Sequence, residues 1–160
     1  MRISVGDHYP AHTVLSPDER GTPKPLDLGK WFDGKTCVIF GGPGAFTSTC
    51  SRTHIPGFIE RSGELRAKGV DAVAWHSVND AFVMAAWAKD LGSPDITMIA
   101  DGSGKLTKAL GLQLDLTSAG MGLRCKRYAS VIINGKVGYF GVEEGLACSA
   151  SSVEEVLEAL

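Results

Sequence analysis

The chain has 160 residues, of which 44% are hydrophobic and 21% charged, as expected for one globular domain with a sizeable core. Its formal net charge of −2 provides no basic excess for nucleic-acid binding. No apolar run is long enough to span a membrane, and residues 1–7 contain neither an apolar signal region nor an amphipathic leader, so we expect a cytoplasmic protein.

Residues 1–40 predict short extended segments that lead into one buried strand. Segments around His12–Leu15 and Lys24–Leu28 flank the turn-forming run Asp18–Gly21, which indicates a hairpin. A helical turn is expected at Gly29–Phe32. The strongly apolar run Thr36–Phe40 predicts a strand that is covered on both faces, as in the centre of a parallel sheet.

Helical and extended patterns then alternate. Residues 51–68 have apolar side chains at helical spacing, and Pro56 should kink or reset this helix near its start. Val70–Trp75 predicts a second strand. Asn79 is a suitable N-cap for a helix over Asp80–Leu91. The apolar side of that helix is expected to carry Phe82, Val83, Ala86 and Trp87.

The next elements are a third strand and a hairpin. The strand is predicted at Ile96–Ala100 and is followed by a short helix at Ser103–Leu110. Lys126–Ile133 and Lys136–Val142 flank the dipeptide Asn134-Gly135, which is typical of a tight β-turn.

The C-terminus predicts one more helix. Ser152 opens a capping box for a helix over Val153–Leu160. The complete order of strands and helices predicts an α/β domain over residues 1–160, in which a central mixed β-sheet is flanked by helices.

Cys50 stands at the junction between the buried strand and the following helix. In the first turn of a helix, the unpaired N–H groups and the positive end of the dipole favour an anion such as a thiolate. We therefore expect Cys50 to be a nucleophile rather than a core residue. Because a free thiol is already a few per cent ionised at neutral pH, ionisation alone accelerates its reactions only about tens-fold. Positioning and transition-state stabilisation must supply the rest.

The four cysteines are Cys37, Cys50, Cys125 and Cys148. They form no C-x-x-C pair and lie at no zinc-binding spacing from histidine, so we expect neither a metal site nor a disulfide framework. Cys37 lies in the apolar strand and is expected to be a core residue.

Several collinear motifs resemble one family. The pattern Pro43-x-x-x-Thr47-x-x-Cys50 resembles the active-site signature of the peroxiredoxins, which are thiol peroxidases with a thioredoxin-like fold. Further segments are similar to the type II branch, the peroxiredoxin five subfamily: Cys50–Phe58, Ser77–Phe82, Ala100–Gly104 and Lys126–Tyr128. The resemblance covers nearly the whole chain. It implies a thiol-dependent peroxidase, with antioxidant and redox-homeostasis roles, that reduces hydrogen peroxide and alkyl hydroperoxides.

The resemblance also assigns roles to individual residues. Cys50 would attack the peroxide, and the Thr47 hydroxyl could donate to the sulfur or accept from the hydroperoxide. Pro43 would shield the sulfur from water. Arg127 would supply the cation that faces the sulfur, although Arg124 is a nearby rival. An apolar rim from Phe46 and Ile55 would suit alkyl substrates.

Regeneration of the oxidised cysteine leaves alternatives open. Cys148 falls where some type II members place a resolving cysteine, and Cys125, two residues before Arg127, could share a strand face with it. Plant-like members carry their second cysteine where this chain has Trp75. The enzyme could also work with one cysteine, so thioredoxin or glutathione with glutaredoxin could be the reductant. No bound cofactor or metal is implied, and the resemblance implies a homodimer.

Two rival functions remain. A redox sensor would use the same oxidation of Cys50 to signal to a partner protein. A cysteine hydrolase would need a general base beside Cys50, and His54 is the near candidate. His54 could instead orient the loop or lie at a subunit interface, and the sequence assigns no role to His76.

Overall fold

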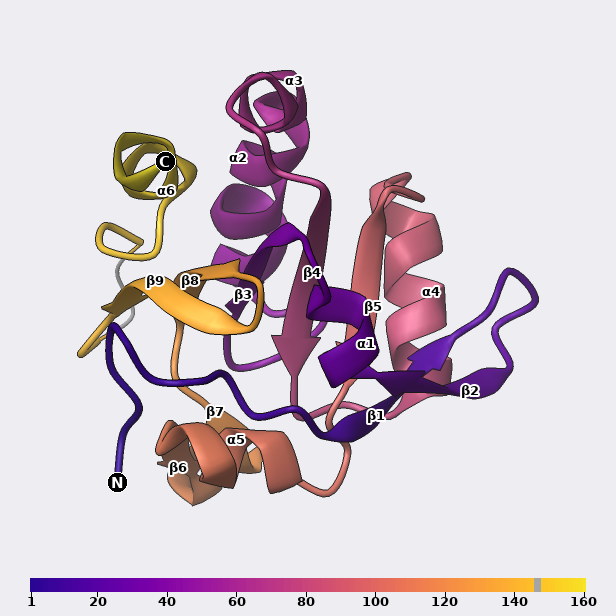
Figure 1. Ribbon diagram of the computed structural model, residues 1–160. Coiled ribbons are helices and arrows are strands. Elements are labelled where there is room, and N and C mark those ends of the chain that lie inside the picture. The colour runs from indigo at the N-terminus through magenta and orange to yellow at the C-terminus, as the bar shows by residue number, and fades with distance from the viewer. Residues whose placement is uncertain (146–147) are drawn as a thin grey trace.

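A computed structural model describes residues 1–145 and 148–160 (Figure 1). In these residues, a mixed seven-stranded sheet has the order β2-β1-β5-β4-β3-β8-β9, and β6 pairs with β7 separately. The strands are β1 Thr13–Pro17, β2 Pro23–Asp27, β3 Thr36–Gly41, β4 Ala72–Ser77, β5 Ile96–Ala100, β6 Gln113–Leu116, β7 Gly122–Cys125, β8 Tyr128–Ile133 and β9 Lys136–Val142. The helices are α1 Leu28–Phe32, η1 Cys50–His54, α2 Ile55–Glu60, α3 Ser62–Ala67, α4 Ala81–Leu91, α5 Lys105–Leu110, η2 Thr117–Ala119 and α6 Val153–Ala159. None of the described helices is long and apolar enough to cross a membrane.

The pairing of β3 brings two distant segments to one edge of the sheet. β3 runs parallel to β4 and antiparallel to β8, so the parallel environment expected for Thr36–Phe40 is correct on one side of the strand only. Gly41, at the end of β3, lies opposite Tyr128, at the start of β8. The loop that follows β3 therefore meets the residues that precede β8.

Alternating side chains of the central strands enter two separate cores. Phe40 and Trp75 pack on one face with residues from α2, α3, α4 and α6. Ile39 and Ala74 pack on the other face with residues from α1 and α5. Figure 1 shows these helices on both faces of the sheet, which confirms the predicted α/β arrangement.

Several predicted elements are confirmed. β1 and β2 form the N-terminal hairpin, and the strand Ile96–Ala100 has the predicted bounds. Asn134 and Gly135 have positive φ angles of 48° and 85°, as a tight hairpin turn requires. Ser152 caps α6 by accepting a hydrogen bond from the Glu155 backbone N–H.

The continuous helix predicted over residues 51–68 is wrong. The segment contains the π-helical turn η1 and the short helices α2 and α3. Pro56 lies in the first turn of α2, where its missing N–H costs no intrahelical bond, so the predicted reset at this proline is confirmed. The wider π turn carries Cys50 at its first position, and such turns are frequent at functional sites.

The predicted cap of α4 is wrong, and of its predicted apolar side only Trp87 is confirmed as buried. Asp80, rather than Asn79, accepts the capping hydrogen bond, from the Val83 N–H. The buried residues of the helix are Ala81, Met84 and Trp87. Phe82 is 69% exposed.

Other boundaries differ by a few residues. Val70 and Asp71 precede β4, which begins at Ala72. Lys126 and Arg127 precede β8 and are not part of the strand. The separate β6–β7 hairpin was not predicted, because each of its strands is only four residues long and gives too short a pattern.

Candidate active site

Cys50 lies buried at the edge where β3 ends and β8 begins. Its Sγ accepts a hydrogen bond from Arg127 Nη1 at 3.2 Å, and the arginine is only 4% exposed. A guanidinium at this distance stabilises negative charge on the sulfur, in a site with little water to screen it. Of the two candidate cations, the structure brings Arg127 to the sulfur, as predicted.

Arg127 has a second neighbour and one unused donor. Nη1 also lies 3.2 Å from His54 Nδ1, and His54 Nε2 lies 2.8 Å from the Ser151 carbonyl oxygen. Arg127 Nε is buried and has no hydrogen-bond partner among the described residues. Because both ring nitrogens of His54 face other partners, the histidine is not placed as a general base for Cys50, and this contradicts the hydrolase hypothesis.

Gly42 makes this close packing possible. A Cβ at this position would lie 3.0 Å from Arg127 Nη1, 3.0 Å from Cys50 Sγ and 3.0 Å from Trp75 Cη2. A side chain here would therefore press on the sulfur and the guanidinium together. No local sequence pattern indicates this role of Gly42, because its neighbours Arg127 and Trp75 come from distant segments.

The loop between β3 and η1 is fixed by its own hydrogen bonds. The Thr47 hydroxyl donates to the Gly44 carbonyl at 2.7 Å, so its proton is not directed at the sulfur. Pro43 is buried, and its carbonyl accepts from Arg124 Nη1 at 3.3 Å. Arg124 thus braces the loop and is not the cation that faces Cys50.

Hydrogen bonds from the connection between β4 and α4 hold the same loop in place. Asn79 Oδ1 accepts from the Ala45 backbone N–H at 2.9 Å and from Ser77 Oγ at 2.8 Å. Ser77 Oγ in turn accepts from Trp75 Nε1 at 3.0 Å. Asn79 therefore positions the active-site loop instead of capping a helix.

The expected apolar rim is present in part. Phe46 is 55% exposed and has a positive φ of 62°. Ile55 is fully buried in the core and does not reach the rim. The prediction that Ile55 contacts substrate is therefore wrong.

Comparisons with known proteins agree with this geometry. The Redoxin family model matches residues 4–157. Peroxiredoxin-2C of Oryza sativa subsp. japonica is 51% identical over 159 residues, which cover 99% of this chain and 98% of the relative. Reduced Prx3 of Vibrio vulnificus, solved in complex with hydrogen peroxide, is 43% identical and has a TM-score of 0.91, over 98% of this chain and 95% of that one. The chain belongs to the peroxiredoxin family.

Family membership confirms the predicted fold class and activity. A thioredoxin fold with a mixed central sheet and a cysteine-dependent peroxidase activity are general to peroxiredoxins, which need no prosthetic group. The described residues contain no group of three or more His, Cys, Asp and Glu side chains that could hold a metal ion.

All four cysteines of this peroxiredoxin are free, and the three besides Cys50 occupy different environments. Cys37 is a core residue, as predicted, and burial raises the pKa of its thiol to about 11. Cys125 ends β7 and packs in the core on the opposite face of the sheet, so the predicted shared strand face with Arg127 is wrong. Cys148 is half-buried, and its Sγ lies 3.9 Å from Ser151 Oγ.

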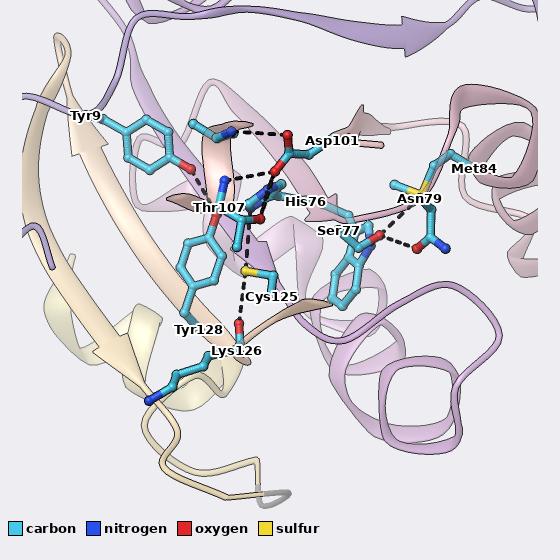
Figure 2. Close-up of polar contacts among 12 residues, drawn as sticks. Tyr9, His76, Ser77, Asn79, Met84, Asp101, Thr107, Cys125, Lys126 and Tyr128 are labelled. Carbon is cyan, nitrogen blue, oxygen red and sulfur yellow. Dashed lines mark hydrogen bonds and ion pairs between the residues drawn. The ribbon is translucent and has the colours of Figure 1, made fainter. Parts of the chain in front are cut away.

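A buried polar network begins at Tyr128, the residue after Arg127 in the sequence (Figure 2). The Tyr128 hydroxyl lies 2.8 Å from Tyr9 OH and 2.8 Å from His76 Nδ1. His76 Nε2 lies 3.0 Å from Asp101 Oδ2, which also accepts from the Thr107 hydroxyl at 2.7 Å. No local sequence pattern predicts this network, because its members come from separate segments of the chain.

Asp101 is the charged end of this network. Burial acts to raise the pKa of its carboxyl group, but hydrogen bonds from His76 and Thr107 outweigh burial and hold the pKa below its usual value. The Leu106 and Thr107 backbone N–H groups also donate to the carboxylate, at 3.1 and 2.8 Å. Asp101 therefore ties the first turn of α5 to β4.

Proposed function

We propose that Cys50 is the peroxidatic residue of this peroxidase. The thiolate attacks the terminal oxygen of the hydroperoxide, an S–O bond forms and the O–O bond breaks. The sulfur loses two electrons and becomes a sulfenic acid, while the other oxygen leaves as an alkoxide or hydroxide and takes up a proton. The products are the Cys50 sulfenic acid and an alcohol or water.

The observation that carries this proposal is the buried contact between Cys50 and Arg127. Nη1 holds the sulfur at 3.2 Å, and the unpaired Nε is available to an oxygen of the bound hydroperoxide. Charge that develops on this oxygen as the O–O bond breaks would meet a donor that is already oriented. The planar guanidinium can contact the sulfur and the peroxide together, which an ammonium does less well.

Thr47 and Pro43 complete the proposed pocket. Because the Thr47 hydroxyl donates its proton to the Gly44 carbonyl, its oxygen is left as an acceptor for the hydroperoxide O–H. Pro43 forms a buried wall that limits the access of water to the sulfur. Phe46 offers the exposed apolar surface that an alkyl hydroperoxide would contact.

Replacement of the cysteines tests this assignment. Cys50→Ser should abolish peroxide reduction, whereas Cys125→Ser should retain it, because Cys125 lies on the opposite face of the sheet. Peroxide consumption with an excess of dithiothreitol measures both variants. Full activity of Cys50→Ser would overturn the proposal.

Cys148 is the proposed resolving cysteine. Its thiol would attack the Cys50 sulfenic acid, forming a disulfide and releasing water, and thioredoxin would then reduce the disulfide. Both cysteines are free in this structure, and we expect the Cys148 segment to move toward Cys50 when the disulfide forms. Burial raises the pKa of the Cys148 thiol, so this movement must also expose the thiol to a proton acceptor.

Turnover with two donors distinguishes this route from a one-cysteine cycle. If Cys148 resolves, Cys148→Ser loses thioredoxin-supported turnover and one equivalent of peroxide yields a Cys50–Cys148 disulfide in wild type. If glutathione with glutaredoxin supports turnover and no disulfide forms, the one-cysteine cycle holds. A single stoichiometric oxidation with neither donor active would favour the sensor.

The oligomeric state and location are also proposed. We expect a homodimer, as the family resemblance implies, and the exposed aromatic rings Phe46 and Phe82 offer apolar surface for such a contact. Light scattering of wild type and of Phe82→Glu would measure the dimer. A cytoplasmic location is also proposed, to be checked by cell fractionation, since two relatives are named as chloroplastic and one as peroxisomal.

A further inference from the structure

His54 is the neighbour of Arg127 that the proposed chemistry does not use. It lies in η1 and is only 1% exposed. Because the Ser151 carbonyl only accepts hydrogen bonds, His54 Nε2 carries a proton. Burial, and next the charge of Arg127, lower the pKa of His54 to about 3, so the ring is neutral at physiological pH. Its Nδ1 therefore presents a lone pair to Arg127 Nη1, at 3.2 Å.

The Ser151 carbonyl is itself held in place by Glu143. This carboxylate is 6% exposed and accepts four hydrogen bonds, from the backbone N–H and hydroxyl of Ser149 at 2.6 and 3.0 Å and from those of Ser151 at 2.8 and 2.8 Å. The Glu143 backbone N–H donates to the Arg127 carbonyl at 2.9 Å. Glu143 thus joins the residues that follow Cys148 to Arg127, the residue before β8.

We propose that His54 is a positioning residue for Arg127 and that Glu143, acting through Ser151, sets the position of His54. The inference rests on the proposed role of Arg127 at Cys50. Arg127 Nη1 is shared between Cys50 Sγ and His54 Nδ1, so the histidine fixes the rotation of the guanidinium plane. A small rotation of this plane would move both the donor on the sulfur and the unpaired Nε that faces the peroxide.

The same coupling gives a role to the contact between Ser151, which follows Cys148, and His54 in the active site with reduced Cys50. While Ser149 and Ser151 remain bound to Glu143, Arg127 is aligned for attack on the peroxide. When this segment leaves to bring Cys148 to Cys50, the Ser151 carbonyl leaves His54. The alignment is then lost at the stage when the sulfur has already reacted.

Three substitutions of His54 separate positioning from packing. The ring of His54 packs edge-on against Phe40 at 5.0 Å, and this contact would survive in His54→Phe. His54→Asn loses the packing but can place an amide oxygen near the Nδ1 site. His54→Gln reaches the Ser151 carbonyl but leaves no acceptor for Arg127.

The measurement is the second-order rate of Cys50 oxidation by hydrogen peroxide, followed by tryptophan fluorescence in a single turnover. We expect His54→Phe and His54→Gln to be slower about 10- to 100-fold, and His54→Asn to stay within about 5-fold of wild type. Thermal melts report folding separately. A packing role predicts the opposite order, with His54→Phe the fastest of the three, and that order would overturn the proposal.

Glu143→Gln tests the second part of the proposal, in which Glu143 sets the position of His54 through Ser151. It should slow the oxidation of Cys50 about 3- to 10-fold, although Glu143 touches neither sulfur nor peroxide. Glu144→Gln is the matched control, because this exposed neighbour pairs with Arg2 and Lys126 at the surface. The double variant His54→Phe/Glu143→Gln should be no slower than His54→Phe alone, since both act on one path.

The outcomes are distinguishable from failure of the proposed function. If wild type does not react with peroxide at Cys50, the proposed function fails. If wild type reacts but Glu143→Gln matches Glu144→Gln, or the double variant shows fully additive losses, only the coupling through Glu143 fails.

Discussion

Two buried polar clusters begin at consecutive residues and are built in different ways. Arg127 points to Cys50 and His54, whereas Tyr128 points to Tyr9 and His76 on the opposite face of the sheet. In the Tyr128 cluster, the described side-chain nitrogens and oxygens have partners. In the Arg127 cluster, a buried donor, Nε, is left without one.

The difference indicates which cluster is structural and which is reactive. A fully satisfied buried network stabilises one arrangement and gains nothing from a ligand. An unsatisfied buried donor costs free energy, and an incoming acceptor can recover that cost. The two cysteines follow the same division, because Cys50 faces a cation, whereas burial, and to a lesser extent the carboxylate of Asp101, raises the pKa of the Cys125 thiol.

Replacement of Arg127 should give the largest effect. Arg127→Gln removes the charge that faces the sulfur and the peroxide, so we expect Cys50 oxidation to slow about 10²- to 10³-fold. Arg127→Lys should fall between this variant and wild type, because it keeps the charge but loses the planar fork. Stopped-flow oxidation by hydrogen peroxide measures both. Wild-type speed in Arg127→Gln would show that the reactive cluster has been misassigned.

Asp101→Asn should affect stability and not chemistry. The amide would place an N–H group against donors from His76, Thr107 or Leu106, so we expect a loss of about 2–3 kcal/mol in the free energy of unfolding. The oxidation rate of folded protein should stay within about 3-fold of wild type, because Asp101 does not contact Arg127 or Cys50. Urea denaturation and stopped-flow oxidation measure the two quantities. A large fall in rate without loss of stability would contradict the division between the clusters.

The same carboxyl group predicts a pH dependence. Because the pKa of Asp101 is lower in the folded protein than the ordinary value of 3.8, its stabilisation is complete above that value and is lost as the pH falls through the folded pKa. The difference in unfolding free energy between wild type and Asp101→Asn should therefore narrow below about pH 4. A constant difference down to the acid transition would show that the carboxylate charge does not contribute.

Gly42→Ala tests how tightly the reactive cluster is packed. The added Cβ would lie 3.0 Å from both Arg127 Nη1 and Cys50 Sγ, so one of them must shift by a few tenths of an ångström. We expect about a 10-fold slower oxidation of Cys50. Gly63→Ala is a suitable control, because a Cβ there would meet no atom within 4 Å. Equal rates for the two variants would mean that the pocket tolerates the displacement.

Local signals predicted much of the fold but little of how these clusters are assembled. The junction at Cys50, the Asn134-Gly135 turn and the strand Ile96–Ala100 depend on neighbouring residues, and all three are confirmed. Asn79 and Asp80 are both good caps, so the sequence could not choose between them. The buried side of α4 was predicted correctly only at Trp87, because the several alanines of the helix leave its apolar periodicity ambiguous.

The contacts of the active site that the sequence did not predict depend on how distant segments pair in the fold. Arg127 was identified only by family resemblance, since its approach to Cys50 depends on the antiparallel pairing of β3 with β8. The roles of Gly42 and Glu143 depend on side chains that arrive from other segments. No local pattern records such contacts.

The smallest effect is expected at the outer end of the satisfied network. Tyr9→Phe removes one hydroxyl but leaves Tyr128 bonded to His76, so it should cost about 1 kcal/mol in unfolding free energy. Tyr128→Phe should cost more, because it leaves the buried Tyr9 hydroxyl without a partner and leaves His76 Nδ1 with only Cys125 Sγ, at 4.0 Å. In the double variant only the histidine nitrogen has lost its partner, so the two losses should be less than additive. Urea denaturation of the three variants gives this coupling, and strict additivity would show that the hydroxyls do not act as one network.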